Sequence, residues 1–245
     1  MTVPADWIEP DWPAPRSVKA LVTTRQGGVS DGPYASLNLG TRVGDEAQAV
    51  AQNRARLRGL LPSEPRWLQQ VHGVDVVRAD RTGGEAIADA AFTDKVGTVC
   101  AVQIADCLPV LLCDRAGTCV AAAHAGWRGL SAGVLERAVS ALGVPPDELM
   151  AWLGPAIGPR KFEVGADVFE SFTNTDPSAT AAFDPLREGK WLADLYALAR
   201  RRLSRAGVDS VFGGGLCTFS DPTRFFSHRR DGVTGRQGAF VWIAA

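Results

Sequence analysis

The sequence predicts an α+β or mixed α/β fold rather than a doubly wound parallel sheet. Segments typical of strands and helices alternate irregularly along the 245 residues, and hairpin-like strand pairs lie among them. The sequence contains no internal repeat and no low-complexity linker. A single domain over residues 18–245, preceded by an N-terminal arm at residues 1–17, is therefore the simpler account.

Apolar and β-branched runs predict the strands. We expect residues 67–71 and 74–79 to pair with each other, and residues 80–94 to form a loop. The two apolar runs on either side of Cys107 are expected to be strands that meet at a turn there. The predicted strands are residues 18–24, 67–71, 74–79, 98–104, 110–113, 118–123, 150–153, 208–213, 225–228 and 239–243.

Apolar residues at helical spacing predict four helices, at residues 45–61, 130–142, 166–172 and 191–206. Prolines alternate with aromatic residues between Trp7 and Pro15. Because proline cannot continue a helix, that segment is expected to be an extended arm whose tryptophans pack on the domain.

Composition excludes several classes of protein. The 26 basic and 27 acidic residues give a net charge of -1, so no general attraction to nucleic acid or to anionic membranes is expected. No apolar run approaches the roughly 18 to 20 residues that span a bilayer, and we expect a cytosolic monomer or weak dimer. The five cysteines are odd in number and lie in apolar surroundings, which argues against a disulfide framework.

Two reactive side chains lie at the borders of apolar runs, at Cys107 and His124, and His72 ends an earlier run. Sites are commonly built at strand ends, so we expect these three residues to converge. Two imidazoles and a thiolate suit Zn²⁺ with one open position, and the same set could bind copper. Without a metal, Cys107 could act as a nucleophile with a histidine as base. The spacing matches no short metal motif, so both alternatives stay open.

Arginines in loops are the candidates for binding an anion. Arg25 stands at the start of a glycine-rich loop, and Arg128 lies between Gly126 and Gly129 at a predicted helix start. Close packing of these two glycines against the sheet explains their presence equally well. The substrate-binding candidates are Arg25, Asn38, Arg128, Arg229 and Arg230.

Motifs for common cofactors and hydrolases have no support in the sequence. It contains no G-x-G-x-x-G after a strand, no Walker loop and no H-E-x-x-H. Its G-x-S-x-G stretch at residues 129–133 places Ser131 inside the predicted helix 130–142, not at the turn directly after a strand that a nucleophilic serine needs. Nucleotide-cofactor and serine-hydrolase functions therefore have no support.

Several sequence blocks together resemble one known family. They are TTRQGGVSDGPYASLNLG, QQVHG, ADCLPVLL, AAAHAGWRGL, AWLGPAIGP, FEVG, KWLADL and FFSHRRDGVTGRQ. These blocks resemble the YfiH-type family, also called the laccase-domain or polyphenol-oxidase-like family, which includes bacterial peptidoglycan editing factors. The resemblance extends from about residue 19 to residue 243, and the ADCLPV and HAGWRG blocks are highly specific.

The resemblance implies a single-domain, layered α/β sandwich with zinc bound by His72, Cys107 and His124. It also implies phosphorolysis of adenosine, inosine, guanosine and 5′-methylthioadenosine, so a nucleoside and phosphate are the expected small-molecule partners, together with deamination of adenosine. The expected catalytic residues are Cys107, His124 and Asp106, the last as an acid–base group. His228 stands where many relatives have an aromatic residue, so a role for it stays open.

The residue inventory decides against one of the family's older names, copper-dependent polyphenol oxidase. A blue-copper centre with a trinuclear cluster needs many histidines, whereas this sequence has three, and Met150 is its one methionine besides Met1. A multicopper laccase cannot be assembled from these residues. Phenol oxidation by a single copper ion, and a non-catalytic or hydrolytic role in editing peptidoglycan precursors, stay as alternatives.

Overall fold

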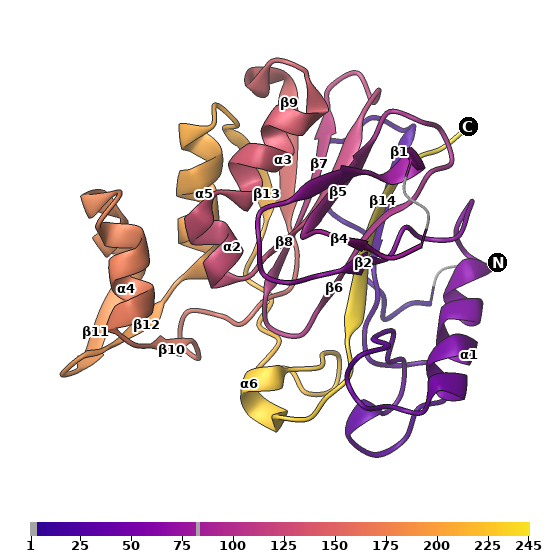
Figure 1. The fold of residues 1–245 in the computed structure, drawn as a ribbon, viewed down its shortest axis with the longest axis horizontal. Helices are drawn as coiled ribbons and strands as arrows, with labels where there is room; N and C mark the ends of the chain where they lie inside the picture. Colours follow the sequence, from indigo (N-terminus) through magenta and orange to yellow (C-terminus); the bar gives the residue numbers. More distant parts are fainter. Residues whose placement is uncertain (1–3, 82–83) are drawn as a thin grey trace.

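A six-stranded mixed sheet lies at the centre of the computed structural model, which describes residues 4–81 and 84–245 (Figure 1). The strand order is β13-β9-β7-β8-β5-β3, and the two edge pairs, β13 with β9 and β3 with β5, are parallel while the other pairs are antiparallel. In this order the strands are Ser210–Gly213, Leu149–Leu153, Leu108–Asp114, Val120–Ala125, Ala90–Thr93 and Val76–Arg78.

A second, antiparallel sheet packs against one face of the central sheet. Its order is β1-β14-β6, with β1 at Val18–Val22, β14 at Gln237–Ile243 and β6 at Cys100–Ile104. Alternate residues of β14 pack between the two sheets, where Ala239 and Val241 are fully buried. The residue between them, Phe240, faces the other way into a separate cluster.

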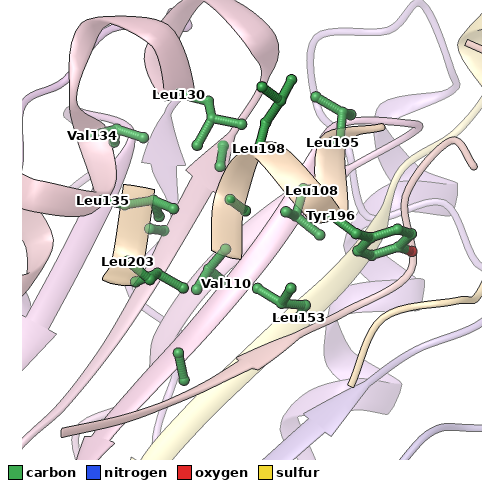
Figure 2. Close-up of a cluster of buried hydrophobic side chains, with 14 of the residues drawn as sticks. Leu108, Val110, Leu130, Val134, Leu135, Leu153, Leu195, Tyr196, Leu198 and Leu203 are labelled. Atoms are coloured by element: carbon green, nitrogen blue, oxygen red, sulfur yellow. The ribbon is translucent and has the colours of Figure 1, made fainter. Parts of the chain in front are cut away.

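Three helices cover the opposite face of the central sheet (Figure 2). They are α2 at Trp127–Ala132, α3 at Val134–Leu142 and α5 at Leu195–Arg205. In β7, Val110 and Leu112 face these helices, whereas Leu111 and Cys113 face the second sheet. Because both faces of β7 are buried, its sequence is a continuous apolar run rather than an alternating one.

Further elements lie at the periphery of the two sheets. Helix α1 packs on the outer face of the second sheet, where its Leu57 joins the cluster of Phe240. The three-stranded sheet β10-β12-β11 and helix α4 form a projection on one side (Figure 1). The bounds are α1 Ala47–Arg58, β2 Leu68–Gln69, β4 Ala86–Ile87, β10 Glu163–Val164, α4 Ala166–Thr173, β11 Phe183–Arg187, β12 Lys190–Ala193 and α6 His228–Asp231, with 3-10 turns η1 Gly32–Tyr34, η2 Ala79–Arg81, η3 Pro146–Glu148 and η4 Pro177–Ala182.

The mixed, layered single-domain fold predicted from the sequence is confirmed. The described part of the N-terminal arm is anchored by a two-way backbone bridge between Ile8 and Val22, at 2.9 and 2.8 Å, and Trp7 is buried. Residues 1–3 of the predicted arm lie outside the described residues, as do residues 82–83 of the predicted loop. The boundary between arm and domain at residue 17 stays a prediction.

The predicted pairing of residues 67–71 with residues 74–79 is wrong. Strand β2 pairs in parallel with β4, and β3 pairs in parallel with β5. Residues 80–94 were expected to be a loop, but they contain η2, β4 and β5. The turn at residues 71–73 sends the chain from one sheet to the other, which local sequence pattern does not reveal.

Other predicted elements differ from the observed ones in extent or in type. The helix predicted at residues 130–142 is two helices, because Gly133 between them has a left-handed φ of 104°. Helix α5 begins at Leu195 rather than residue 191, since the Asp194 carboxylate caps it and the preceding residues form β12. Residues 225–228 are no strand: Phe225 is buried in a loop, and α6 begins at residue 228.

No helix within residues 4–81 and 84–245 combines the length and the apolar character needed to cross a lipid bilayer.

Replacing a side chain at the centre of the main core tests this layering. We expect Leu112→Ala to lower the free energy of unfolding by about 2 to 5 kcal/mol, because Leu112 is fully buried beneath the helices. Leu186→Ala is the matched control, since Leu186 is 44% exposed, and we expect it to change stability by less than about 0.5 kcal/mol. Urea unfolding followed by circular dichroism measures both, and equal losses would contradict the assigned core.

Candidate metal centre

Three separate elements bring His72, Cys107 and His124 together. His72 lies in the turn after β2, Cys107 between β6 and β7, and His124 near the end of β8. The possible ligand atoms of the three residues all lie within 4.8 Å of one another. The Cys107 Sγ atom is 3.7 Å from His72 Nε2, and the two imidazole centroids are 4.8 Å apart. The convergence expected from the sequence is therefore present.

The carboxylate of Asp89 holds the two histidine segments in place. Its Oδ1 atom lies 2.8 Å from His124 Nδ1 and accepts a hydrogen bond from the backbone N–H of His72 at 2.9 Å. Its Oδ2 atom accepts from the N–H groups of Val71 and Gly73 at 3.2 and 2.6 Å. The backbone N–H of His124 also donates to the Asp89 carbonyl at 2.7 Å. One fully buried residue thus fixes the His72 turn and the ring of His124.

Charges in the centre shift three pKa values. Burial alone would raise the pKa of the Cys107 thiol, but the adjacent His124 and His72 lower it to about 6. Burial would likewise lower the pKa of His124, but the Cys107 sulfur and the Asp89 carboxylate raise it to about 9. Burial of Asp89 is outweighed by its bonds to His124 and to backbone N–H groups, so its pKa is lowered. Without a metal, the centre at neutral pH is a thiolate beside an imidazolium.

The donor set fits a borderline-soft divalent metal such as zinc. Asp89 engages Nδ1 of His124, so the Nε2 atom is the one that can bind a metal. A carboxylate that holds the other nitrogen of a metal-binding histidine is the usual arrangement in metal sites. Ligand atoms of a tetrahedral zinc site are about 3.4 to 3.7 Å apart, close to the 3.7 Å between Cys107 Sγ and His72 Nε2. A Cβ atom on Gly126 would lie only 2.8 Å from the His72 ring and 3.0 Å from Cys107 Sγ. Glycine there leaves the donors free of obstruction.

The centre opens onto a cleft of about 480 Å³. This volume is within the roughly 300 to 1,000 Å³ typical of small-molecule sites. Cationic and amide side chains form much of its wall. Besides the three centre residues, the cleft is lined by the loop 40–43 and by Leu68, Gln69, Gln70, Glu85, Gln103, Ala105, Arg128, His228 and Arg236.

Of the five residues predicted to bind substrate, Arg128 lines this cleft and the other four are outside its lining. Arg25 donates to the carbonyls of residues 35 and 222. Asn38 is fully buried, and its Oδ1 atom accepts from the backbone N–H of Arg236 at 2.8 Å. Its Nδ2 donates to the carboxylate of residue 45.

Arg229 and Arg230 are engaged with backbone around the cleft rather than with its interior. The Arg229 guanidinium donates to the Glu163 carbonyl at 2.7 Å. The Arg230 guanidinium donates to the carbonyls of residues 218, 219 and 225 and pairs with Asp231 at 2.6 Å. Contact of Arg25, Asn38, Arg229 and Arg230 with a substrate stays a prediction.

Asp106 precedes Cys107 with a left-handed φ of 89°. Its Oδ1 atom accepts from the Thr218 hydroxyl at 2.6 Å, and its Oδ2 atom accepts from the Arg229 backbone N–H at 2.6 Å. Its backbone carbonyl accepts from Ile157 N–H. Asp106 thus ties the Cys107 turn to three other segments, and the predicted acid–base role stays a prediction.

Sequence reasoning missed two residues that the geometry makes central. Asp89 stands directly before the small apolar run 90–92, so a carboxylate at the entry of an unrecognised buried strand was the available signal. Arg236 stands one residue before β14 and lines the cleft. No pattern distinguished it from the other arginines of the FFSHRRDGVTGRQ block.

The chain is similar to proteins of one known family. A family model for multi-copper polyphenol oxidoreductase laccase matches residues 19–244. A protein from Pseudomonas aeruginosa named purine nucleoside phosphorylase is 56% identical over 238 residues, covering 97% of this chain and 98% of that protein. The Escherichia coli K12 protein named purine nucleoside phosphorylase YfiH is 55% identical over 242 residues, covering 96% and 98%.

Solved structures show the same fold. A crystal structure of a Neisseria meningitidis protein is 53% identical, with a TM-score of 0.95, and the match covers 98% of this chain and 100% of that one. The structure of YlmD from Geobacillus stearothermophilus is 32% identical, with a TM-score of 0.88 and coverage of 94% and 93%. The chain therefore belongs to the multi-copper polyphenol oxidoreductase laccase family, the YfiH-type family that its sequence blocks resemble.

Proposed function

We propose that this protein is a zinc-dependent purine nucleoside phosphorylase acting on adenosine, inosine, guanosine and 5′-methylthioadenosine, with adenosine deaminase activity as well. The observation that carries the proposal is the set His72, Cys107 and His124, which opens onto a cleft lined by arginine and glutamine side chains. The names of relatives at 56% and 55% identity support the phosphorylase part. A nucleoside and phosphate are the proposed partners of the cleft.

The thiolate and the two imidazoles would hold the zinc ion. With three protein ligands and an accessible side toward the cleft, the ion would supply Lewis acidity and lower the pKa of a bound water to about 7. Asp89 keeps the proton on His124 Nδ1, so that Nε2 presents a lone pair to the metal. Metal binding releases the proton that the metal-free thiolate and imidazolium pair shares.

Phosphorolysis needs groups that bind an anion and a purine in one place. In the reaction a phosphate oxygen forms a bond to C1′ of the ribose, the bond from C1′ to N9 breaks, and the purine leaves with that electron pair and takes up a proton. Arg128 lines the cleft and has no carboxylate partner among the described residues, so it is available for an anion. The Gln103 side chain also lines the cleft and offers a donor and an acceptor to a purine edge.

Deamination adds water at C6 of adenosine, and the bond from C6 to the amino nitrogen then breaks to release ammonia and leave inosine, so it needs a group that transfers a proton from the water to the leaving nitrogen. Both carboxylate oxygens of Asp106 already accept hydrogen bonds. These bonds position the Cys107 turn, and the acid–base role predicted for Asp106 stays a prediction. The titratable side chains on the cleft wall outside the metal donors include His228 and Glu85, which we propose as further groups for proton transfer.

One alternative rests on the same donors. The family's name and the soft His, Cys, His set favour a single copper ion that oxidises phenols, because copper exceeds zinc in affinity for most nitrogen and sulfur ligands. That function predicts phenol oxidation that rises with bound copper and persists after all zinc is removed.

The primary test is product formation by zinc-loaded protein. With inosine and phosphate we expect hypoxanthine and ribose 1-phosphate in equal amounts, and with adenosine we expect adenine and inosine, each followed by chromatography. Cys107→Ser should abolish release, because it removes a metal ligand. Cys217→Ser is the matched control, since Cys217 lies outside the donor set and its change should leave turnover intact. Absence of any free base with full zinc occupancy would refute the proposed function.

A second test addresses the role of Asp89. We expect Asp89→Asn to weaken zinc binding by about 10- to 100-fold, because it removes the charge that orients His124. Asp114→Asn is the matched control: Asp114 is a buried carboxylate that accepts two backbone N–H groups and a hydroxyl, but away from the cleft. We expect Asp114→Asn to lower the free energy of unfolding without changing the affinity for zinc. Competition with a chromophoric chelator measures both, and wild-type affinity in Asp89→Asn would contradict the assigned role.

A further inference from the structure

Arg236 is a guanidinium held in a fixed position on the cleft wall. Its Nη1 atom donates to the carbonyls of Thr234 and Gly235 at 3.0 and 2.9 Å. Its backbone N–H donates to Asn38 Oδ1, and its side chain packs so closely on Gly40 that a Cβ there would be 2.9 Å from Arg236 Cγ. The side chain is therefore oriented before any ligand arrives.

The charge of Arg236 is not neutralised by a carboxylate. Among the residues that the structure describes, no carboxylate oxygen lies within 4.0 Å of its guanidinium, whereas Arg42, another arginine of the cleft, is paired with Glu85 at 3.3 Å. Partial burial lowers the pKa of Arg236, although the charges of Cys107 and Asp106 raise it. A half-buried cation that no carboxylate contacts directly is costly, so such a residue beside an open cleft is typical of an anion site.

The free edge of this guanidinium suits an oxyanion. Among the described residues, both side-chain hydrogen bonds of Arg236 use Nη1, so Nε and Nη2 are left to form a two-pronged contact. Arg128 and His228 line the same cleft and can donate to further oxygens of the anion. The side chains of Arg236, Arg128 and His228 thus place three hydrogen-bond donors around one cleft, and Arg236 is held in a fixed orientation. This set suits a tetrahedral anion better than a neutral nucleoside.

We infer that Arg236 anchors the phosphate co-substrate, with Arg128 and His228 completing the subsite. This inference rests on the proposed phosphorylase function and adds the residue that binds its second substrate. It explains why Asn38, expected to touch substrate, is buried: its amide oxygen positions the backbone of Arg236. The anion could be free phosphate or the phosphate of a nucleoside monophosphate, and the experiment separates the two.

Binding of inorganic phosphate to the full-length, zinc-loaded protein tests the inference directly. We expect calorimetry to show phosphate affinity about 10- to 100-fold weaker in Arg236→Gln, because a charge-assisted fork is lost. Arg200→Gln is the matched control: Arg200 also donates to two backbone carbonyls, at 2.7 and 2.8 Å, but it lies outside the cleft lining. Its phosphate affinity should equal that of the wild type. Inosine 5′-monophosphate forms the second arm, and we expect it to bind more weakly than phosphate with inosine present.

Kinetics separate this inference from the proposed function. In Arg236→Gln we expect a KM for phosphate at least tenfold higher with the KM for inosine nearly unchanged, while adenosine deamination, which uses no phosphate, persists. Arg236→Lys keeps the charge without the two-pronged contact and should give an intermediate phosphate affinity. Thermal unfolding of this variant checks that the fold is retained.

Phosphate affinity within twofold of wild type in Arg236→Gln would overturn the inference, as would tighter binding of the monophosphate. A further outcome is that the wild type releases no free base while Arg236→Gln still binds phosphate more weakly than the wild type does. That result would refute the proposed phosphorylase function and support the phosphate subsite.

Discussion

The buried carboxylate of Asp89 is the interaction on which the rest of the centre depends. It accepts hydrogen bonds from three backbone N–H groups of the turn at residues 71–73, which lies in a different segment of the chain. The same carboxylate fixes the ring of His124. A buried charge is tolerated only when it is fully hydrogen-bonded, and this one is. Two histidines from distant parts of the sequence are thereby held at fixed positions relative to Cys107, which is the condition for a metal site with an open side.

The two packed sheets explain why these residues meet where they do. Strands β6 and β7 belong to different sheets, and the chain passes between them at the Cys107 turn, which Asp106 secures to the segments of Thr218 and Arg229. Strand β8 is buried on both faces, so small residues fill it until His124, and Gly126 then keeps the space above the donors clear. The core therefore fixes the backbone on which the centre is built, while the cleft wall combines loops with residues of β2, β6, α2 and α6.

The sequence allowed prediction of the mixed fold, most strands and the three converging residues, because apolar runs and strand-end polar residues are local signals. Parallel pairing of β2 with β4 and of β3 with β5 depends on contacts between segments, so local pattern predicts a loop over residues 80–94 and assigns no role to Asp89. The same limit applies to arginines. Residue type alone could not separate Arg230, which is paired with Asp231 and lies outside the cleft lining, from Arg236, which lines the cleft and has no carboxylate partner among the described residues.

We propose that one zinc ion is held by one sulfur and two imidazole nitrogens. X-ray absorption spectroscopy at the zinc edge, on protein purified without added metal, tests it most directly. The account predicts near-stoichiometric zinc with one sulfur at about 2.3 Å, two imidazole nitrogens at about 2.0 to 2.1 Å and one further light-atom ligand. A zinc spectrum without sulfur, or copper as the metal found at that stoichiometry, would contradict it.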